Sequence, residues 1–206
     1  MNEKELYSIL ADEKSIQNSI KSLNGNGFEA LVVETATEAK EMVLRMLPKR
    51  AEVMTMTSVT LDTIGISKEI NENGNYSSVR EKLSSMNRET QVSETQKLGA
   101  APDWVIGSVH AVTEDGKVMI ASATGSQLPA YVYGSSHVIW IVGSQKIVKD
   151  MEEGLKRIYE YVFPLENERA MKAYGMGSGV NKLLIVNKEV SLGRITIIIV
   201  KEKLGF

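Results

Sequence analysis

The chain of 206 residues contains no cysteine, and this absence removes several kinds of chemistry. Without thiols the chain has no disulfide, no thiolate nucleophile, no cysteine-based zinc site and no iron–sulfur cluster of its own. Histidine is nearly as scarce, since His110 and His137 are the only two. Carboxylates alone remain as ligands for a hard cation. We therefore predict no metal site, and the sequence identifies no cofactor.

Charge of one sign and long apolar runs are also lacking. A formal net charge of −2 gives no basic face for nucleic acid. No apolar run approaches the roughly 20 residues that cross a bilayer, and the N-terminus has no apolar signal core. We therefore expect a cytoplasmic protein that binds neither nucleic acid nor membrane. Charge runs such as KDMEEGLKR (149–157) mix both signs, which is typical of a solvated helix face.

What is present fits an ordinary globular domain, because 43% of the residues are apolar and 24% are charged. Residues 1–27 are predicted to form an N-terminal helix that ends at NGNG (24–27). Its apolar positions recur at roughly helical spacing: Leu6, Ile9, Leu10, Ile16, Ile20 and Leu23. We expect residues 28–206 to form one α/β domain.

The first part of this domain follows a strand, helix, strand pattern. FEALVVE (28–34) and AEVMTMT (51–57) are typical of strands, and between them Thr35 and Glu38 predict a capping box. The helix that follows has one apolar stripe and stops at Pro48. The segment predicts a βαβ unit with a parallel pair of strands.

Residues 58–98, which follow the βαβ unit, are expected to form short helices. Five later segments have the composition of strands. DWVIGSV (103–109) and KVMIAS (117–122) are expected to run antiparallel around an Asp-Gly turn. HVIWIVG (137–143) has the composition of a strand buried on both faces. KLLIVNK (182–188) and RITIIIV (194–200) are expected to form a hairpin-like pair. The predicted fold is a single α/β domain with a mixed, mainly parallel sheet flanked by helices.

Three loops after predicted strands carry candidate ligand-binding residues. They are TMTSVT (55–60), ATGSQ (123–127) and VGSQKIVKD (142–150). Hydroxyl groups and backbone N–H groups suit an anion, glycine permits close approach of the backbone, and a lysine supplies positive charge. Each loop also has a structural explanation: a helix N-cap in the first, a plain turn in the second and an exposed lysine in the third.

We predict that the three loops converge on one pocket for an anionic small molecule, because ligands bind beyond the carboxyl ends of parallel strands. The predicted ligand-binding residues are Ser58, Thr60, Thr124, Gly125, Ser126, Gln127, Gly143 and Lys146. His110, at a strand end beside acidic residues, is the candidate for proton transfer. A hydrogen-bonded structural histidine is the alternative. The glycine-rich signatures of P-loop nucleoside triphosphatases and of dinucleotide-binding proteins are absent.

Four segments together resemble the LUD-domain family of lactate utilization proteins. They are SVTLDTIGI (58–66), the block from DWVIGSV to GSQKIV (103–148), LKRIYEYVFPLENERA (155–170) and GRITIIIVKEKLGF (193–206). The resemblance covers nearly all of the chain after residue 28. It implies a mixed α/β fold of the NagB/RpiA/CoA-transferase type. Fold analogy by itself transfers no reaction.

The resemblance leaves three functions open. The first is an accessory or ligand-binding subunit in the oxidation of lactate or a similar small organic acid, with iron–sulfur oxidoreductase subunits as partners. The second is a stand-alone enzyme acting on a phosphorylated or CoA-like anionic metabolite, and the third is a regulatory binding module. Related short members carry a cysteine cluster where this chain has AYGMGSGVNK (173–182). Because the chain has no cysteine, we expect no electron relay through it.

Overall fold

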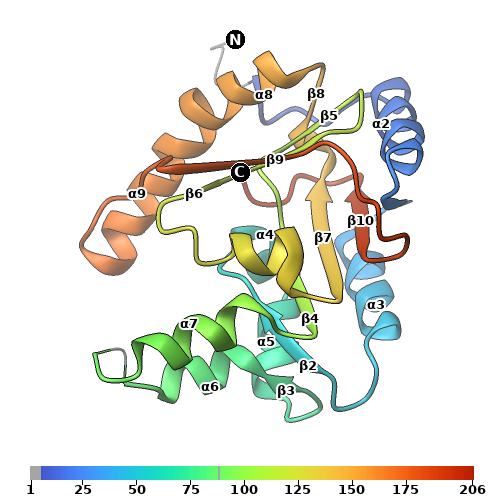
Figure 1. Cartoon of the computed structure of the whole chain (residues 1–206). Coiled ribbons are helices and arrows are strands. Elements are labelled where there is room, and N and C mark those ends of the chain that lie inside the picture. Colours follow the sequence, from blue (N-terminus) through green and yellow to red (C-terminus); the bar gives the residue numbers. More distant parts are fainter. Residues whose placement is uncertain (1–5, 88) are drawn as a thin grey trace.

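A computed structural model describes residues 6–87 and 89–206 of the chain. Its central feature is a six-stranded sheet in the order β1-β10-β7-β4-β2-β3, in which all neighbouring strands are parallel (Figure 1). The strands of this main sheet are β1 (Glu29–Val33), β2 (Glu52–Thr55), β3 (Ser77–Ser78), β4 (Trp104–Gly107), β7 (His137–Gly143) and β10 (Ile195–Val200).

A second, smaller sheet has the order β8-β5-β6-β9 and mixes both strand directions. Its strands are β5 (Ala111–Thr113), β6 (Val118–Ser122), β8 (Ile147–Val148) and β9 (Lys182–Val186). β6 is antiparallel to β5 and to β9, whereas β8 is parallel to β5. The predicted α/β domain with a mainly parallel sheet flanked by helices is confirmed, although the antiparallel strands form a sheet of their own.

Three predicted pairings are wrong. DWVIGSV (103–109) does not pair with KVMIAS (117–122), because β4 lies in the main sheet and β6 pairs with β5 and β9 in the second. β9 and β10 form no hairpin, because β10 lies between β1 and β7 in the main sheet and β9 is an edge strand of the second. Every residue of β10 is buried, as a strand covered on both faces requires, and β9 is only partly buried. β1 and β2 are not neighbours either, since β10, β7 and β4 lie between them.

β7 is the central strand that its composition predicts. Ile139 and Ile141 are 1% and 0% exposed, and they pack toward one face of the main sheet. Val138, Trp140 and Val142 pack toward the other face, because successive side chains of a strand alternate. The strand is therefore covered on both sides.

Helices cover the Ile139 face of the main sheet. They are α3 (Ala36–Met46), α4 (Val59–Thr63) and α5 (Ile66–Glu72). The opposite face is covered by the second sheet and by α2 (Glu13–Gly25), α6 (Val79–Ser85), α7 (Val92–Ala100) and the short π-helix Ala130–Gly134. Beyond the second sheet lie α8 (Met151–Lys156), the π-helical segment Arg157–Val162 and α9 (Phe163–Tyr174) (Figure 1).

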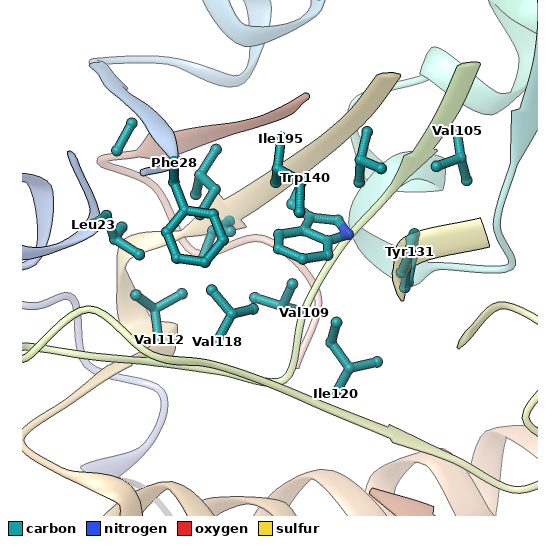
Figure 2. Close-up of a cluster of buried hydrophobic side chains, with 14 of the residues drawn as sticks. Leu23, Phe28, Val105, Val109, Val112, Val118, Ile120, Tyr131, Trp140 and Ile195 are labelled. Carbon is teal, nitrogen blue, oxygen red and sulfur yellow. The ribbon is translucent and has the colours of Figure 1, made fainter. Parts of the chain in front are cut away.

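Aromatic side chains fill the space between the two sheets. Figure 2 shows the Trp140 indole between Phe28 and Tyr131, with Val118 and Ile120 of the second sheet below this row of rings. The Tyr131 and Trp140 rings meet edge to face with centroids 5.4 Å apart, a favourable geometry for an aromatic pair. This packing fixes the second sheet against the main sheet.

The N-terminal helix begins later than its apolar pattern predicts. Asp12 caps α2 by accepting a 2.7 Å hydrogen bond from the Ser15 backbone, so α2 begins at Glu13. The predicted positions Leu6, Ile9 and Leu10 precede this cap and are exposed, and residues 1–5 lie outside the described residues. No helix in the described part of the chain is long and apolar enough to span a membrane.

The predicted capping box at the start of α3 has a modified geometry. Thr35 Oγ1 accepts a 3.2 Å hydrogen bond from the Glu38 backbone, as a capping threonine should. The Glu38 carboxylate accepts a 3.0 Å hydrogen bond from the backbone N–H of Glu34, whereas in the usual box it would accept from the capping residue, Thr35.

Candidate functional site

The carboxyl end of the main sheet is where the chain crosses to the second sheet. It crosses once after β4, through residues 108–110 into β5, and again after β7, through residues 144–146 into β8. Because β5 and β8 pair in parallel, the two crossings lie side by side. β2 and β4 are neighbours, but within this sheet the chain continues from β2 to β3 on one side and from β4 to β7 on the other. Ligand sites in α/β sheets usually lie at the carboxyl end of the sheet where the strand order reverses in this way.

Lys146 lies at this junction and is buried, with 3% of its surface exposed. Its Nζ donates hydrogen bonds to Thr60 Oγ1 at 2.9 Å and to Ser108 Oγ at 3.0 Å. The predicted residues Thr60 and Lys146 thus meet, and the alternative of an exposed lysine is wrong. Burial, and then the charge of Arg157, hold the pKa of Lys146 well below its ordinary value.

The two hydroxyl groups beside Lys146 have their own protons committed elsewhere. Thr60 donates to the carbonyl oxygen of Leu204 at 3.1 Å, and Ser108 donates to that of Ile141 at 2.7 Å. Both hydroxyl oxygens therefore act as acceptors toward Lys146 Nζ.

Arg157 is a second buried cation near the junction, with 0% of its surface exposed. Its Nη1 donates to the carbonyl oxygen of His110 at 2.8 Å, and its guanidinium lies 5.3 Å from the ring centroid of Tyr161. Its Nε and Nη2 have no hydrogen-bond partner among the described residues. Burial lowers the pKa of Arg157 to about 10, which still leaves it charged at neutral pH.

The prediction of a solvated helix face over residues 149–157 is wrong at Arg157. Lys149, Asp150, Glu152 and Lys156 are exposed as expected. Arg157 instead turns inward, because α8 packs closely against the second sheet. A Cβ atom on Gly154 would approach Met119 Sδ to 2.4 Å, so glycine permits this close packing.

His110, the predicted proton-transfer residue, is partly exposed at the edge of the junction. Its Nδ1 accepts a 3.1 Å hydrogen bond from the backbone N–H of Ala121, so the neutral ring carries its proton on Nε2. Burial, and then the charges of Lys146 and Arg157, lower the pKa of His110 to about 3. In this tautomer His110 offers a hydrogen-bond donor rather than a base.

The C-terminal tail, residues 201–206 after β10, encloses the junction on the side of Thr60. The buried Gln145 amide donates to the Leu204 carbonyl at 2.9 Å and accepts from the Leu204 N–H at 3.3 Å. The predicted ligand-binding residue Gly143 lies under this tail. A Cβ atom on it would come within 2.2 Å of Gln145 Oε1 and 2.7 Å of Leu204 N. In the structure Gly143 therefore permits the tail to pack closely.

Ser58 caps α4 by accepting from the Leu61 N–H, which matches the structural alternative for this loop. The ATGSQ loop follows β6 in the second sheet and is held by local contacts. Thr124 donates to Ser126 at 3.1 Å and Gln127 accepts from Ser122 at 3.0 Å, while Gly125 has a φ of 85° and packs against Lys182. Within residues 6–87 and 89–206, these side chains make no hydrogen bond to Lys146, Thr60 or Ser108.

Sequence reasoning missed Ser108 and Arg157. Ser108 follows directly after β4, and this position at a strand end was a usable signal. Arg157 had no such signal, because it ends a run of exposed charges.

Two surface hollows lie elsewhere, one lined by residues including Leu47 and Tyr76 and the other by residues including Lys21 and Glu114. No group of three or more potential metal-ligating side chains gathers in the described part of the chain.

The chain matches the family model of the LUD domain over residues 16–200. Among solved structures, it is similar to a DUF162 family protein from Deinococcus radiodurans, with a TM-score of 0.58 and 12% sequence identity. That similarity covers 93% of this chain and 99% of the other, and at this identity it shows the fold alone. A search of curated proteins gave no match. Since the family model covers residues 16–200 of the 206, the chain belongs to the LUD-domain family.

Proposed function

We propose that this LUD-domain protein is a ligand-binding accessory subunit in the oxidation of lactate or a similar small organic acid, with no redox centre of its own. One observation carries the proposal. Lys146 and Arg157 are both buried at the sheet junction, and no described carboxylate lies within 4.0 Å of either.

Arg157 keeps its charge at neutral pH, and a buried cation without a counter-ion is unfavourable, because its removal from water costs several kcal/mol. An anionic ligand would offset this cost by supplying the missing negative charge. Arg157 has two nitrogen atoms without partners, and a guanidinium binds a carboxylate through two parallel hydrogen bonds. Arg157 is therefore the residue that we assign to a ligand carboxylate.

A 2-hydroxy acid has a second oxygen on the carbon next to its carboxylate. Lys146 and Ser108 supply polar atoms for that oxygen, and His110 supplies a ring N–H. Ser108 and His110 are partly exposed, whereas Lys146 and Arg157 are buried. The ligand would therefore enter between Ser108 and His110.

The chain holds no cysteine for an iron–sulfur cluster, so the electrons removed from such an acid would pass to a partner. Iron–sulfur oxidoreductase subunits are the partner class that we propose. Mixing the protein with such subunits should permit lactate-dependent reduction of their clusters. The change in visible absorbance of the clusters would measure it.

Calorimetry with lactate, and with uncharged lactamide as a control ligand, tests the site directly. We expect lactate to bind and lactamide to bind much more weakly. Lys146→Met and Arg157→Met should each weaken lactate binding by about 1–3 kcal/mol, the contribution of a hydrogen bond to a charged group. Lys149→Met and Arg45→Met, which change exposed cations, are the matched controls.

Unchanged lactate affinity in both buried variants would contradict the proposed site. Tighter binding of a phosphate ester than of lactate would favour the alternative, an enzyme for phosphorylated metabolites.

A further inference from the structure

The hydrogen bonds around Lys146 leave one position on its nitrogen free. Thr60 and Ser108 give their hydroxyl protons to backbone carbonyls, so Lys146 Nζ must be the donor in both of its contacts. These two contacts use two N–H bonds. In the described residues Nζ has no third hydrogen-bond partner. A neutral amine has two N–H bonds and one lone pair, and it satisfies this arrangement without an unpaired donor.

The electrostatic surroundings also favour a neutral amine. Lys146 is 3% exposed, has no described carboxylate within salt-bridge distance, and lies near the charge of Arg157. An ammonium ion in this position would be buried, repelled and without a counter-ion. A desolvated lysine beside another cation is the usual way in which proteins prepare an amine nucleophile.

The surroundings also hold the amine in place. Lys146 ends a short 3₁₀ turn, Ser144–Lys146, between two strands, and the preceding Gln145 is tied to Leu204. Thr60 comes from the start of α4 and Ser108 from the end of β4, so three separate elements position Nζ. A fixed amine loses little conformational freedom when it reacts. The partly exposed Ser108 marks the side from which a reactant would approach.

We propose that Lys146 captures 2-oxo acids covalently, by forming a Schiff base between its Nζ and the C2 carbonyl carbon. The lone pair of Nζ bonds to C2, the C2–O π electrons move to oxygen, and a proton passes from nitrogen to that oxygen. The resulting hydroxyl group leaves as water with the second amine proton, and a C=N bond forms. One amine and one ketone thus give one imine and one water, with no change of oxidation state.

This inference rests on the proposed function, because a 2-oxo acid is the product of oxidising a 2-hydroxy acid. The same contacts would serve both molecules, with the carboxylate at Arg157 and C2 at Lys146. If the imine takes up a proton from solvent, the carboxylate of the bound acid supplies the negative charge that the protein lacks there.

Borohydride trapping tests the proposal. The protein is incubated with pyruvate near neutral pH, reduced with sodium borohydride, and examined by intact mass and peptide mass spectrometry. We expect one reduced adduct per chain, located on Lys146. An exposed lysine, whose ordinary pKa is about 10.4, is almost wholly protonated at neutral pH and should react little. Acetone, which has the carbonyl but no carboxylate, should label Lys146 less than pyruvate does.

Three variants separate the amine from its surroundings. Lys146→Arg introduces a fixed cation and removes the amine nucleophile, and Lys146→Met removes the nucleophile without adding a charge, so both should lose the adduct. Lys149→Met, which changes an exposed lysine three positions away, should keep it. The comparison of pyruvate with acetone uses the unmodified protein, so it remains informative if a variant fails to fold.

Labelling spread over exposed lysines, with none on Lys146, would overturn the proposal. Pyruvate that binds in calorimetry without any trapped adduct would overturn covalent capture and leave the proposed function intact. Neither binding nor trapping of pyruvate, together with no binding of lactate, would overturn both.

Discussion

Lys146 Nζ donates a 2.9 Å hydrogen bond to Thr60 Oγ1 across 86 residues of sequence, inside the protein. The bond joins the turn after β7 to the start of α4, and Ser108 links the same nitrogen to the end of β4. Loops that follow three strands of the main sheet therefore meet at one amine. Four predictions test this arrangement and its supports.

Replacing Lys146 by methionine should leave stability unchanged or increase it. Methionine fills a similar volume and removes a buried amine that has no carboxylate partner, a change that is often neutral or stabilising. Thr60 and Ser108 keep the carbonyls to which they donate. Thermal unfolding would measure this, with Lys149→Met as the control. A strongly lowered melting temperature would show that Lys146 has a structural role that outweighs the cost of its burial.

Gln145→Leu should destabilise the protein by about 1–3 kcal/mol, because it removes the acceptor of the buried Leu204 N–H, while the Leu204 carbonyl keeps only the hydrogen bond from Thr60. The Gln145 side chain both donates to and accepts from the Leu204 backbone, and Leu204 is 2% exposed. Urea denaturation would give the difference. Gln96→Leu changes an exposed glutamine of α7 and should cost little. Equal stability of the two variants would mean that the tail contributes nothing to the junction.

Stability should fall as the pH drops from about 6.5 toward 3, partly because of His110. The folded protein holds the pKa of His110 at about 3, below its ordinary value of 6.5. Between these two values the unfolded chain binds more protons, so acid favours unfolding. Burial is the first cause, and the charges of Lys146 and Arg157 act in the same direction.

His110→Asn should flatten this acid dependence. The asparagine Oδ1 replaces Nδ1 as acceptor for the Ala121 N–H, but the side chain does not titrate. The wild-type slope should exceed that of the variant by at most about 1.4 kcal/mol per pH unit, the limit for one proton. Chemical denaturation at several pH values would measure both slopes. Parallel slopes below pH 6.5 would rule out the lowered pKa of His110.

Gly107→Ala should destabilise the end of β4 by about 1–3 kcal/mol through overpacking. A Cβ atom at Gly107 would lie 1.7 Å from Tyr131 Oη and 2.8 Å from Tyr131 Cζ. Tyr131→Phe removes the nearer atom, so the double variant should recover part of the loss. Gly99→Ala, in α7 with its nearest atom 3.8 Å away, is the matched control and should not destabilise. A double-mutant cycle without coupling would contradict the contact.

The sequence by itself was sufficient for the fold class and for the central strand. The unbroken apolar run of HVIWIVG requires cover on both faces, and the structure places β7 between β10 and β4. The caps at Thr35, Ser58 and Asp150 are local hydrogen bonds between near neighbours, so a few residues determine them. Family membership likewise followed from motifs spread along the chain and is confirmed by the family model.

Only the tertiary structure decided which strands are neighbours and which side chains are buried. The partners of β9 and β10 depend on which faces the rest of the chain leaves uncovered, and no local pattern contains that information. Arg157 looks like the surface charges before it, and only the packing of α8 on the second sheet buries it. The residues next to Lys146 in the sequence do not distinguish it from a surface lysine. The crossing after β4 brings Ser108 to it, and the start of α4 brings Thr60. Burial then lowers the pKa of Lys146, because desolvation depends on every element that excludes water from the amine.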